Sequence, residues 1–295
     1  MPGTIYLLPN LVSDGKVADA LPAGTLDAMR RIDRFLVEAA KTARAAIKAM
    51  GHPKPVSELV IEEIGHDPDP GKIDGWLAPV LAGEDAAILS ESGCPGVADP
   101  GAQIVARAHA LGIRVRPLVG PSSILLALMA SGLDGQRFRF LGYLPIAEDE
   151  RRAAIVNLER QSRASETQLF IETPYRNTHM LASLVKTLAP ETRVTVATDI
   201  MGAGESIRTL HVREWKELDQ AARTLPKLPT VFAVLAEAGR GSAPRYAPEH
   251  AKHKGEKTEK AEKFVSSRPN GTKPHRGSSN RPKGAKRPDR RKGEH

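Results

Sequence analysis

Short apolar runs alternate along the chain with longer segments in which apolar residues recur at helical spacing. Apolar runs bounded by Gly, Pro, Asn or Asp predict buried strands, and helical spacing predicts helices that pack on them. We expect strands at residues 4–8, 33–37, 59–64, 86–89, 113–118, 138–143, 168–172, 193–198, 206–212 and 230–235. We expect a short helix from Thr25 and further helices at residues 39–50, 73–81, 103–111, 124–131, 148–160, 180–188 and 214–224.

This alternation is typical of an α/β fold. We predict two consecutive α/β domains, at residues 1–120 and 121–239, each of ordinary domain size. The periodicity ends near Gly239, so residues 240–295 are expected to form a separate region.

The charge of the chain is concentrated in that last region. Residues 241–295 hold 16 Lys and Arg against 6 Asp and Glu, whereas the rest of the chain holds 27 against 29. With so few large apolar residues, this tail cannot bury enough surface to offset the entropy of ordering, so we expect it to be disordered. Its charge favours contact with RNA phosphates, and the alternative interpretation is a solubilising tail.

A few residue types indicate the cellular compartment of the protein and whether it binds a metal. Cys94 is the single cysteine, which excludes an intrachain disulfide and fits a reducing compartment. The N-terminus lacks the pattern of a signal peptide, and no apolar stretch approaches the roughly 20 residues that span a bilayer. We therefore expect a soluble cytoplasmic protein without membrane contact. The His-Asp-Pro-Asp-Pro segment at residues 66–70 is interpreted as a solvated turn, so no metal site is expected.

The most informative segment is the Gly- and Pro-rich turn at residues 90–101, between a buried strand and a helix. Ligands of open α/β sheets bind outside the carboxyl ends of the strands, where such turns lie. Its glycines allow close approach of the backbone to a ligand, and Asp99 is expected to be an N-cap before Pro100. The alternative interpretation is a tight structural turn.

Three other strand ends carry polar candidates. The loop at residues 9–15 has neither a G-x-G-x-x-G fingerprint nor a P-loop, which argues against a dinucleotide site or an NTPase. Glu38 ends a strand and could serve a site or simply complement a helix dipole. Ser122 and Ser123 could bind a ligand or cap the following helix.

Five of these turns, taken in order, resemble motifs of one enzyme family. They are Ser-Glu-Ser-Gly-Cys-Pro-Gly-Val-Ala-Asp-Pro-Gly at 90–101, Gly-Pro-Ser-Ser at 120–123, Gly-Tyr-Leu-Pro at 142–145, Phe-Ile-Glu-Thr-Pro-Tyr-Arg at 170–176 and the strand at 229–237. Across about residues 4–238 the chain resembles the tetrapyrrole methylase-like (class III) S-adenosylmethionine-dependent methyltransferases. Within them it most resembles the branch that methylates a cytidine ribose 2′-oxygen in 16S rRNA.

The resemblance implies two αβα domains with S-adenosylmethionine between them, usually in a homodimer. Carried over residue by residue, it implies donor contacts from Pro9, Ser92, Gly93, Cys94, Val97, Ser122, Ser123, Leu144, Pro229 and Thr230. Glu38 and Glu172 are candidates for acceptor binding or proton removal, because a ribose hydroxyl needs a base or strong positioning. Either carboxylate could instead hold a loop by hydrogen bonds.

Departures from the family pattern keep other functions open. The family's A-E-D-T-R is Val-Glu-Ala-Ala-Lys at residues 37–41, Cys94 replaces a Thr, and Tyr175 departs from the pattern beside Arg176. The leading interpretation is a methyltransferase that acts on ribosomal RNA. The alternatives are a tetrapyrrole or other small-molecule methyltransferase of the same fold and a non-catalytic RNA-binding protein on this fold.

Overall fold

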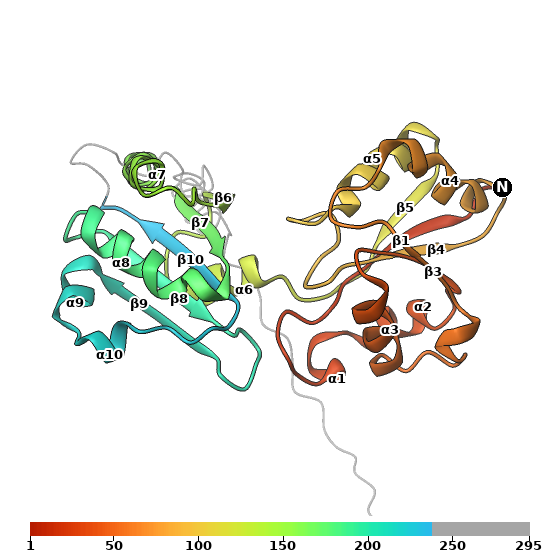
Figure 1. Ribbon diagram of the computed structural model, residues 1–295, viewed down its shortest axis with the longest axis horizontal. Helices are drawn as coiled ribbons and strands as arrows, with labels where there is room; N and C mark the ends of the chain where they lie inside the picture. The colour runs from red at the N-terminus through yellow and green to blue at the C-terminus, as the bar shows by residue number, and fades with distance from the viewer. Residues whose placement is uncertain (238–295) are drawn as a thin grey trace, which may run out of the picture. The chain divides into compact units, whose positions relative to one another are not determined.

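The computed structural model describes residues 1–237, which form two five-stranded sheets (Figure 1). The first sheet is entirely parallel and has the order β3-β2-β4-β1-β5. Its strands are β1 (Thr4–Leu8), β2 (Arg34–Val37), β3 (Val60–Glu63), β4 (Ala86–Leu89) and β5 (Arg114–Pro117). Parallel strands bring their carboxyl ends to one edge of the sheet, so the loops after β1, β2 and β4 are neighbours.

Both faces of the first sheet are covered, as a parallel sheet requires. Figure 1 shows α2 (Ala23–Met29) and α3 (Ala40–Ala49) on one face and α4 (Pro70–Leu81) and α5 (Gly101–Ala110) on the other. Successive residues of a strand point to opposite faces, so Ala87 and Leu89 join the core with Met29, whereas Ile88 joins the core with Leu77.

The second sheet is mixed and has the order β6-β7-β10-β8-β9. Its strands are β6 (Phe138–Tyr143), β7 (Thr167–Glu172), β8 (Arg193–Thr198), β9 (Ser206–His211) and β10 (Thr230–Leu235). Only β6 and β7 pair in parallel, and the other three pairings are antiparallel.

Helices also cover both faces of the second sheet. One core combines the strands with α7 (Glu148–Ser162), α8 (Asn177–Thr187) and α9 (Val212–Glu217), and it contains the fully buried Trp215. The other core packs α6 (Ser123–Ser131) against β7, β8 and β10. The remaining short elements are α1 (Val17–Ala20), η1 (Val56–Glu58), η2 (Pro174–Arg176) and α10 (Gln220–Arg223).

All ten strands lie where the sequence predicts them, and the differences concern the helices. The helix expected at 214–224 is two helices, because Asp219 leaves the helix and caps α10 by accepting from the Ala222 amide at 2.7 Å. Asp99 is not the N-cap of α5. Pro100 holds that position, and Asp99 stabilises the preceding loop instead. The α1 helix was not predicted, because it has four residues and buries none of them.

The predicted domain boundary remains a prediction, with β1 to β5 before residue 120 and β6 to β10 after it. The predicted tail, residues 240–295, lies outside the described residues. No helix within residues 1–237 combines the length and the apolar character that a bilayer crossing requires.

Candidate functional site

A pocket of about 330 Å³ is lined by residues of both halves of the chain, most of which lie at strand ends or in the adjoining loops. Its lining from the first half of the chain is Val12, Ser13, Glu38, Ser90, Glu91, Ser92, Val97, Ala98 and Asp99. Its lining from the second half is Ser123, Ile124, Tyr143, Ile171, Glu172, Thr173, Pro174, Ala197, Ile200, Pro229, Thr230 and Val231. Four carboxylates line the pocket, and no Lys or Arg of residues 1–237 does. Its charge therefore favours a cationic ligand.

Asp99 holds the loop at residues 90–101 in shape. Its Oδ1 accepts from the amides of Gly96 at 2.9 Å and Gly101 at 2.8 Å, and its Oδ2 accepts from Ser90 Oγ at 2.8 Å. Ala98 beside it has a φ of 54°, a left-handed conformation that a residue with a Cβ adopts only at a cost. Because Ala98 lines the pocket, the Asp99 hydrogen bonds hold a strained backbone against the ligand space.

Asn10 joins the loop after β1 to the loop after β4. Its amide donates to the Gly93 carbonyl at 2.9 Å, and its side-chain Nδ2 donates to the carbonyls of Ser90 at 3.1 Å and Glu91 at 3.2 Å. Asn10 was missed at the sequence level, although an Asn directly after a strand is a common loop-forming residue.

Ser13 follows on the same loop and lines the pocket. Its buried Oγ has no hydrogen-bond partner among the described residues. A buried hydroxyl without a partner is costly, and a ligand with a polar group in the pocket would satisfy it. No sequence signal distinguished Ser13 from an ordinary loop serine.

A third loop, after β5, packs on the other two. Cys94 Sγ donates to the Pro121 carbonyl at 3.3 Å, and burial raises the pKa of the Cys94 thiol, which favours this donor form. Ser122 caps α6 by accepting from the Leu125 amide at 3.5 Å, and Ser123 lines the pocket.

The sequence-predicted residues therefore fall into two groups. Seven of them line the pocket: Glu38, Ser92, Val97, Ser123, Glu172, Pro229 and Thr230. The other five, Pro9, Gly93, Cys94, Ser122 and Leu144, do not line it. Pro9, Gly93 and Cys94 pack the loops on one another, and Leu144 belongs to the core of the second sheet. The donor contacts assigned to both groups remain predictions.

Glu38 lies in the pocket wall at the end of β2, with its side chain 12% exposed. Its Oε1 contacts Nδ1 of the exposed His66. Burial raises the pKa of the Glu38 carboxyl above its ordinary value; His66 opposes this shift, whereas the charges of Glu91 and Asp99 add to it. A carboxylate shifted in this way is better matched to accept a proton near neutral pH than an exposed one.

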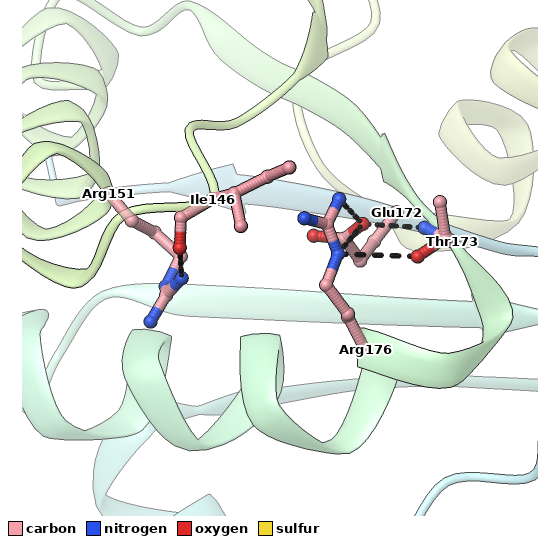
Figure 2. Close-up of polar contacts among 5 residues, drawn as sticks. All are labelled: Ile146, Arg151, Glu172, Thr173 and Arg176. Carbon is pink, nitrogen blue, oxygen red and sulfur yellow. Dashed lines mark hydrogen bonds and ion pairs between the residues drawn. The ribbon is translucent and has the colours of Figure 1, made fainter.

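Glu172 is an ion-paired carboxylate at the end of β7, with its side chain 3% exposed (Figure 2). Its Oε1 accepts from Arg176 Nε at 2.9 Å, from Arg176 Nη2 at 2.5 Å and from the Thr173 amide at 2.6 Å. These bonds fix η2 beside the pocket. These bonds support the alternative interpretation, in which the Glu172 carboxylate holds a loop.

Thr230 belongs to a buried polar network, because its Oγ1 accepts from Asn177 Nδ2 at 2.9 Å and lies 3.1 Å from Thr198 Oγ1. Asn177 also donates to the Leu228 carbonyl at 2.8 Å and so positions the segment that leads to Pro229. Asn177 was not among the sequence candidates, since nothing in its local pattern indicates burial.

Arg151 is a buried arginine that supports the loop after β6 (Figure 2). Its Nη1 donates to the Ile146 carbonyl at 2.6 Å, its Nε donates to Ser183 Oγ at 3.2 Å, and its Nη2 lies 2.7 Å from His179 Nε2. It forms no ion pair within the part of the chain that the structure describes. Because the loop follows Tyr143, these bonds help to place the pocket rim.

Comparison with known proteins places this chain in a family. Residues 18–216 match the family model described as Tetrapyrrole (Corrin/Porphyrin) Methylases. A Pseudomonas aeruginosa protein named "Ribosomal RNA small subunit methyltransferase I" is 32% identical over 200 residues, which cover 66% of this chain and 69% of that protein. The Escherichia coli O157:H7 protein of the same name is 28% identical, over 75% of this chain and 74% of its own length.

Coverage differs among these relatives, and the match to the Mesorhizobium japonicum protein of the same name spans about half of its length. Among solved structures, the methyltransferase CobJ has a TM-score of 0.53 and 18% identity, over 83% of this chain and 98% of that chain. At this identity the likeness concerns the fold alone. With the family match covering most of residues 1–237, the chain belongs to the tetrapyrrole (corrin/porphyrin) methylase family and is an S-adenosylmethionine-dependent methyltransferase.

Proposed function

We propose that the chain methylates ribosomal RNA of the small subunit and that S-adenosylmethionine binds in the pocket between the strand-end loops. The observation that carries the donor site is the pocket itself, which is acidic and lies where the strand-end loops meet. The acceptor class rests on the name shared by the curated relatives.

The lining residues fit this donor in charge and polarity. S-adenosylmethionine carries a positive sulfonium and an ammonium group, which match the carboxylates of the wall. Apolar side chains such as Val12, Ile124 and Ile200 offer surface for its adenine, and the unpartnered Ser13 Oγ offers a hydrogen bond.

We assign direct donor contacts to five residues on the pocket wall. They are Ser92, Val97, Ser123, Pro229 and Thr230. Pro9, Gly93, Cys94, Ser122 and Leu144 would act one layer behind them, by fixing the loops. When bound, S-adenosylmethionine supplies an electrophilic methyl group, so the main task of the chain is to position the acceptor in line with it.

Glu38 is our candidate for the group that receives the acceptor proton. Its raised pKa suits proton removal from a hydroxyl, and its place in the pocket wall puts it within reach of a bound acceptor. Glu172 is the weaker candidate, because it is ion-paired with Arg176 and its hydrogen bonds to Arg176 and the Thr173 amide hold the adjoining turn. The proposed acceptor atom is the ribose 2′-oxygen of a cytidine, from the likeness to that branch of the family.

We further propose that the chain works as a homodimer in the cytoplasm and that its basic tail contacts RNA phosphates. The tail, residues 241–295, lies outside the described residues, and its contribution rests on its charge alone. The oligomeric state is measurable by light scattering coupled to size-exclusion chromatography.

Calorimetric titration with S-adenosylmethionine tests the donor site. We expect micromolar binding that Val97→Trp abolishes, because Val97 lines the pocket, whereas Val119→Trp leaves it unchanged, since the exposed Val119 lies outside the lining. Radiolabelled methyl transfer to small-subunit rRNA, with a tetrapyrrole precursor in parallel, then tests the acceptor. Transfer to the tetrapyrrole alone would favour the small-molecule alternative, and donor binding without any transfer would favour the non-catalytic one.

A further inference from the structure

Tyr175 is an aromatic side chain left in solvent beside the pocket. The residue is 80% exposed and follows Thr173 and Pro174, which line the pocket. Lys227 Nζ lies 5.4 Å from the centroid of the Tyr175 ring. Four of the nine other aromatic residues of the described part are buried in cores, as Phe35, Phe170 and Trp215 are, and none is as exposed as Tyr175. An exposed aromatic ring with a cation against it is an unusual feature to find at a site mouth.

The turn that carries the Tyr175 ring is fixed by hydrogen bonds on both sides of it. Arg176 donates its amide to the Thr173 carbonyl at 2.9 Å, and its guanidinium is paired with the buried Glu172 carboxylate. The turn that carries Tyr175 is therefore held in place before a ligand arrives, which lowers the entropy cost of stacking on the Tyr175 ring.

A second tyrosine lies at the same pocket. Tyr143 ends β6, is 59% exposed and lines the pocket, and it pairs in the sheet with Ile171. Tyr143 and Tyr175 are thus both exposed and both adjoin the ligand space.

Because of the charge of the pocket, an RNA substrate needs a binding surface outside it. Three of its four carboxylates, Glu38, Glu91 and Asp99, have no ion pair with a Lys or Arg of residues 1–237 and repel phosphates, so a strand that delivers one nucleotide to the pocket must be held from outside it. Arg176 is neutralised by Glu172, whereas the exposed Lys227 forms no ion pair within residues 1–237. Single-stranded nucleic acid is commonly bound by aromatic stacking next to a cation.

We propose that Tyr175 and Lys227 form a binding platform for single-stranded RNA at the pocket mouth, which rests on the proposed function. The Tyr175 ring stacks on the base of a nucleotide that neighbours the methylated one, and the Lys227 ammonium contacts a phosphate of the same strand. Tyr143 stacks on the nucleotide that enters the pocket.

Fluorescence anisotropy with the full chain and a fluorescein-labelled, mixed-sequence single-stranded RNA of 12 nucleotides tests the platform. Measurements at about 0.15 M and about 0.3 M salt separate stacking from the tail's electrostatic contribution, because only the latter falls steeply with salt. We expect Tyr175→Ala to weaken binding about tenfold at both salt concentrations, and Tyr175→Phe to bind like the unmodified chain. Lys227→Gln should make the slope of log affinity against log salt concentration shallower by about one, as expected for the loss of one phosphate contact.

Phe138→Ala is the matched control, since Phe138 is an exposed aromatic at the opposite end of the strand that ends in Tyr143. Unchanged RNA affinity for Tyr175→Ala, or an equal loss for Phe138→Ala, would overturn the platform. If Tyr175→Ala methylates rRNA with an unchanged KM for RNA, the platform fails and the proposed function stands. If the unmodified chain methylates no RNA, but Tyr175→Ala still weakens oligonucleotide binding, the platform stands and the proposed function fails.

Discussion

Gly120 packs so closely on Pro9 that a Cβ at position 120 would lie 2.3 Å from the Pro9 Cβ and 2.6 Å from its Cγ. The proline ring cannot rotate away, so no side chain fits between the loops after β1 and β5. We predict that Gly120→Ala destabilises the protein by about 1–3 kcal/mol, as measured by urea denaturation, and weakens S-adenosylmethionine binding in calorimetry.

Gly75→Ala is the control for that substitution. Gly75 lies inside α4 with no atom within 4 Å of an added Cβ. Alanine is the better helix former, so this variant should gain about 0.5–1 kcal/mol and bind the donor normally. If the two variants were equally stable, the close contact between Gly120 and Pro9 would not contribute to the stability of the protein.

The ion pair of Glu172 and Arg176 supports a second prediction. Arg176→Met leaves a carboxylate whose side chain is 3% exposed without its partner, and breaking a buried pair in this way costs about 3–5 kcal/mol. Because the Thr173 amide still donates to Glu172, we expect the lower end of that range in chemical denaturation.

Two further variants interpret that loss. Adding Glu172→Gln to Arg176→Met should recover part of the stability, since no charge is then left buried. Arg107→Met breaks the pair with Asp74, in which both side chains are largely exposed, and should change stability little. A large loss in Arg107→Met would mean that ion pairs here stabilise irrespective of burial.

Asp99 gives a third prediction, because one carboxylate accepts three hydrogen bonds that shape the loop at residues 90–101. Asp99→Ala releases the strained Ala98 and should weaken S-adenosylmethionine binding at least about tenfold. Ser90→Ala removes only the hydroxyl that contacts Asp99 Oδ2 and the Ser92 carbonyl, leaves both amide bonds to Asp99 in place, and should weaken binding less. Calorimetric affinities of the two variants check this order, and a tighter-binding Asp99→Ala would contradict it.

The sequence predicted the strands well because local patterning determines them, and it predicted the loops as ligand-binding because Gly and Pro accumulate there. It could not predict which loop residues face the pocket. Cys94 and Val97 lie three residues apart in one motif, yet Cys94 bonds to the Pro121 carbonyl and Val97 lines the pocket. Between them the backbone has positive φ values at Gly96 and Ala98, and the Asp99 side chain holds this conformation by hydrogen bonds that residue periodicity does not reveal.

The hairpin-like turn at residues 202–205 indicates the antiparallel pairing of β8 with β9, but the antiparallel pairings of β10 with β7 and β8 were beyond the sequence patterns. A buried apolar strand such as β10 reads the same in either direction, and its direction is set by where the connecting helices pack. Asn177 was not recognised as part of the site either, because its hydrogen bond to Thr230 joins residues that are distant in sequence.

Glu38 provides a fourth prediction, on activity. If it receives the acceptor proton, Glu38→Gln should lower the rate of methyl transfer by about 10²–10⁴-fold with little change in donor affinity. In the unmodified chain the rate should fall on acidification at a pH above the ordinary glutamate value of 4.5, because the pKa of Glu38 is raised. A flat pH profile down to 4.5, or a fully active Glu38→Gln, would exclude it as the base.

The same residue predicts how stability depends on pH. Because burial raises the pKa of Glu38, the folded protein binds its proton more tightly than the unfolded chain does. Its contribution to stability is therefore fully present below the ordinary value of 4.5 and is lost as the pH rises through the raised pKa. Glu38→Gln, which stays neutral, should be more stable than the unmodified chain at pH 7 to 8, and this advantage should disappear toward pH 4. Denaturant titrations of both proteins across that range measure the difference. An advantage that grows as the pH falls would mean that the contact with His66, not the burial of the carboxylate, dominates at this position.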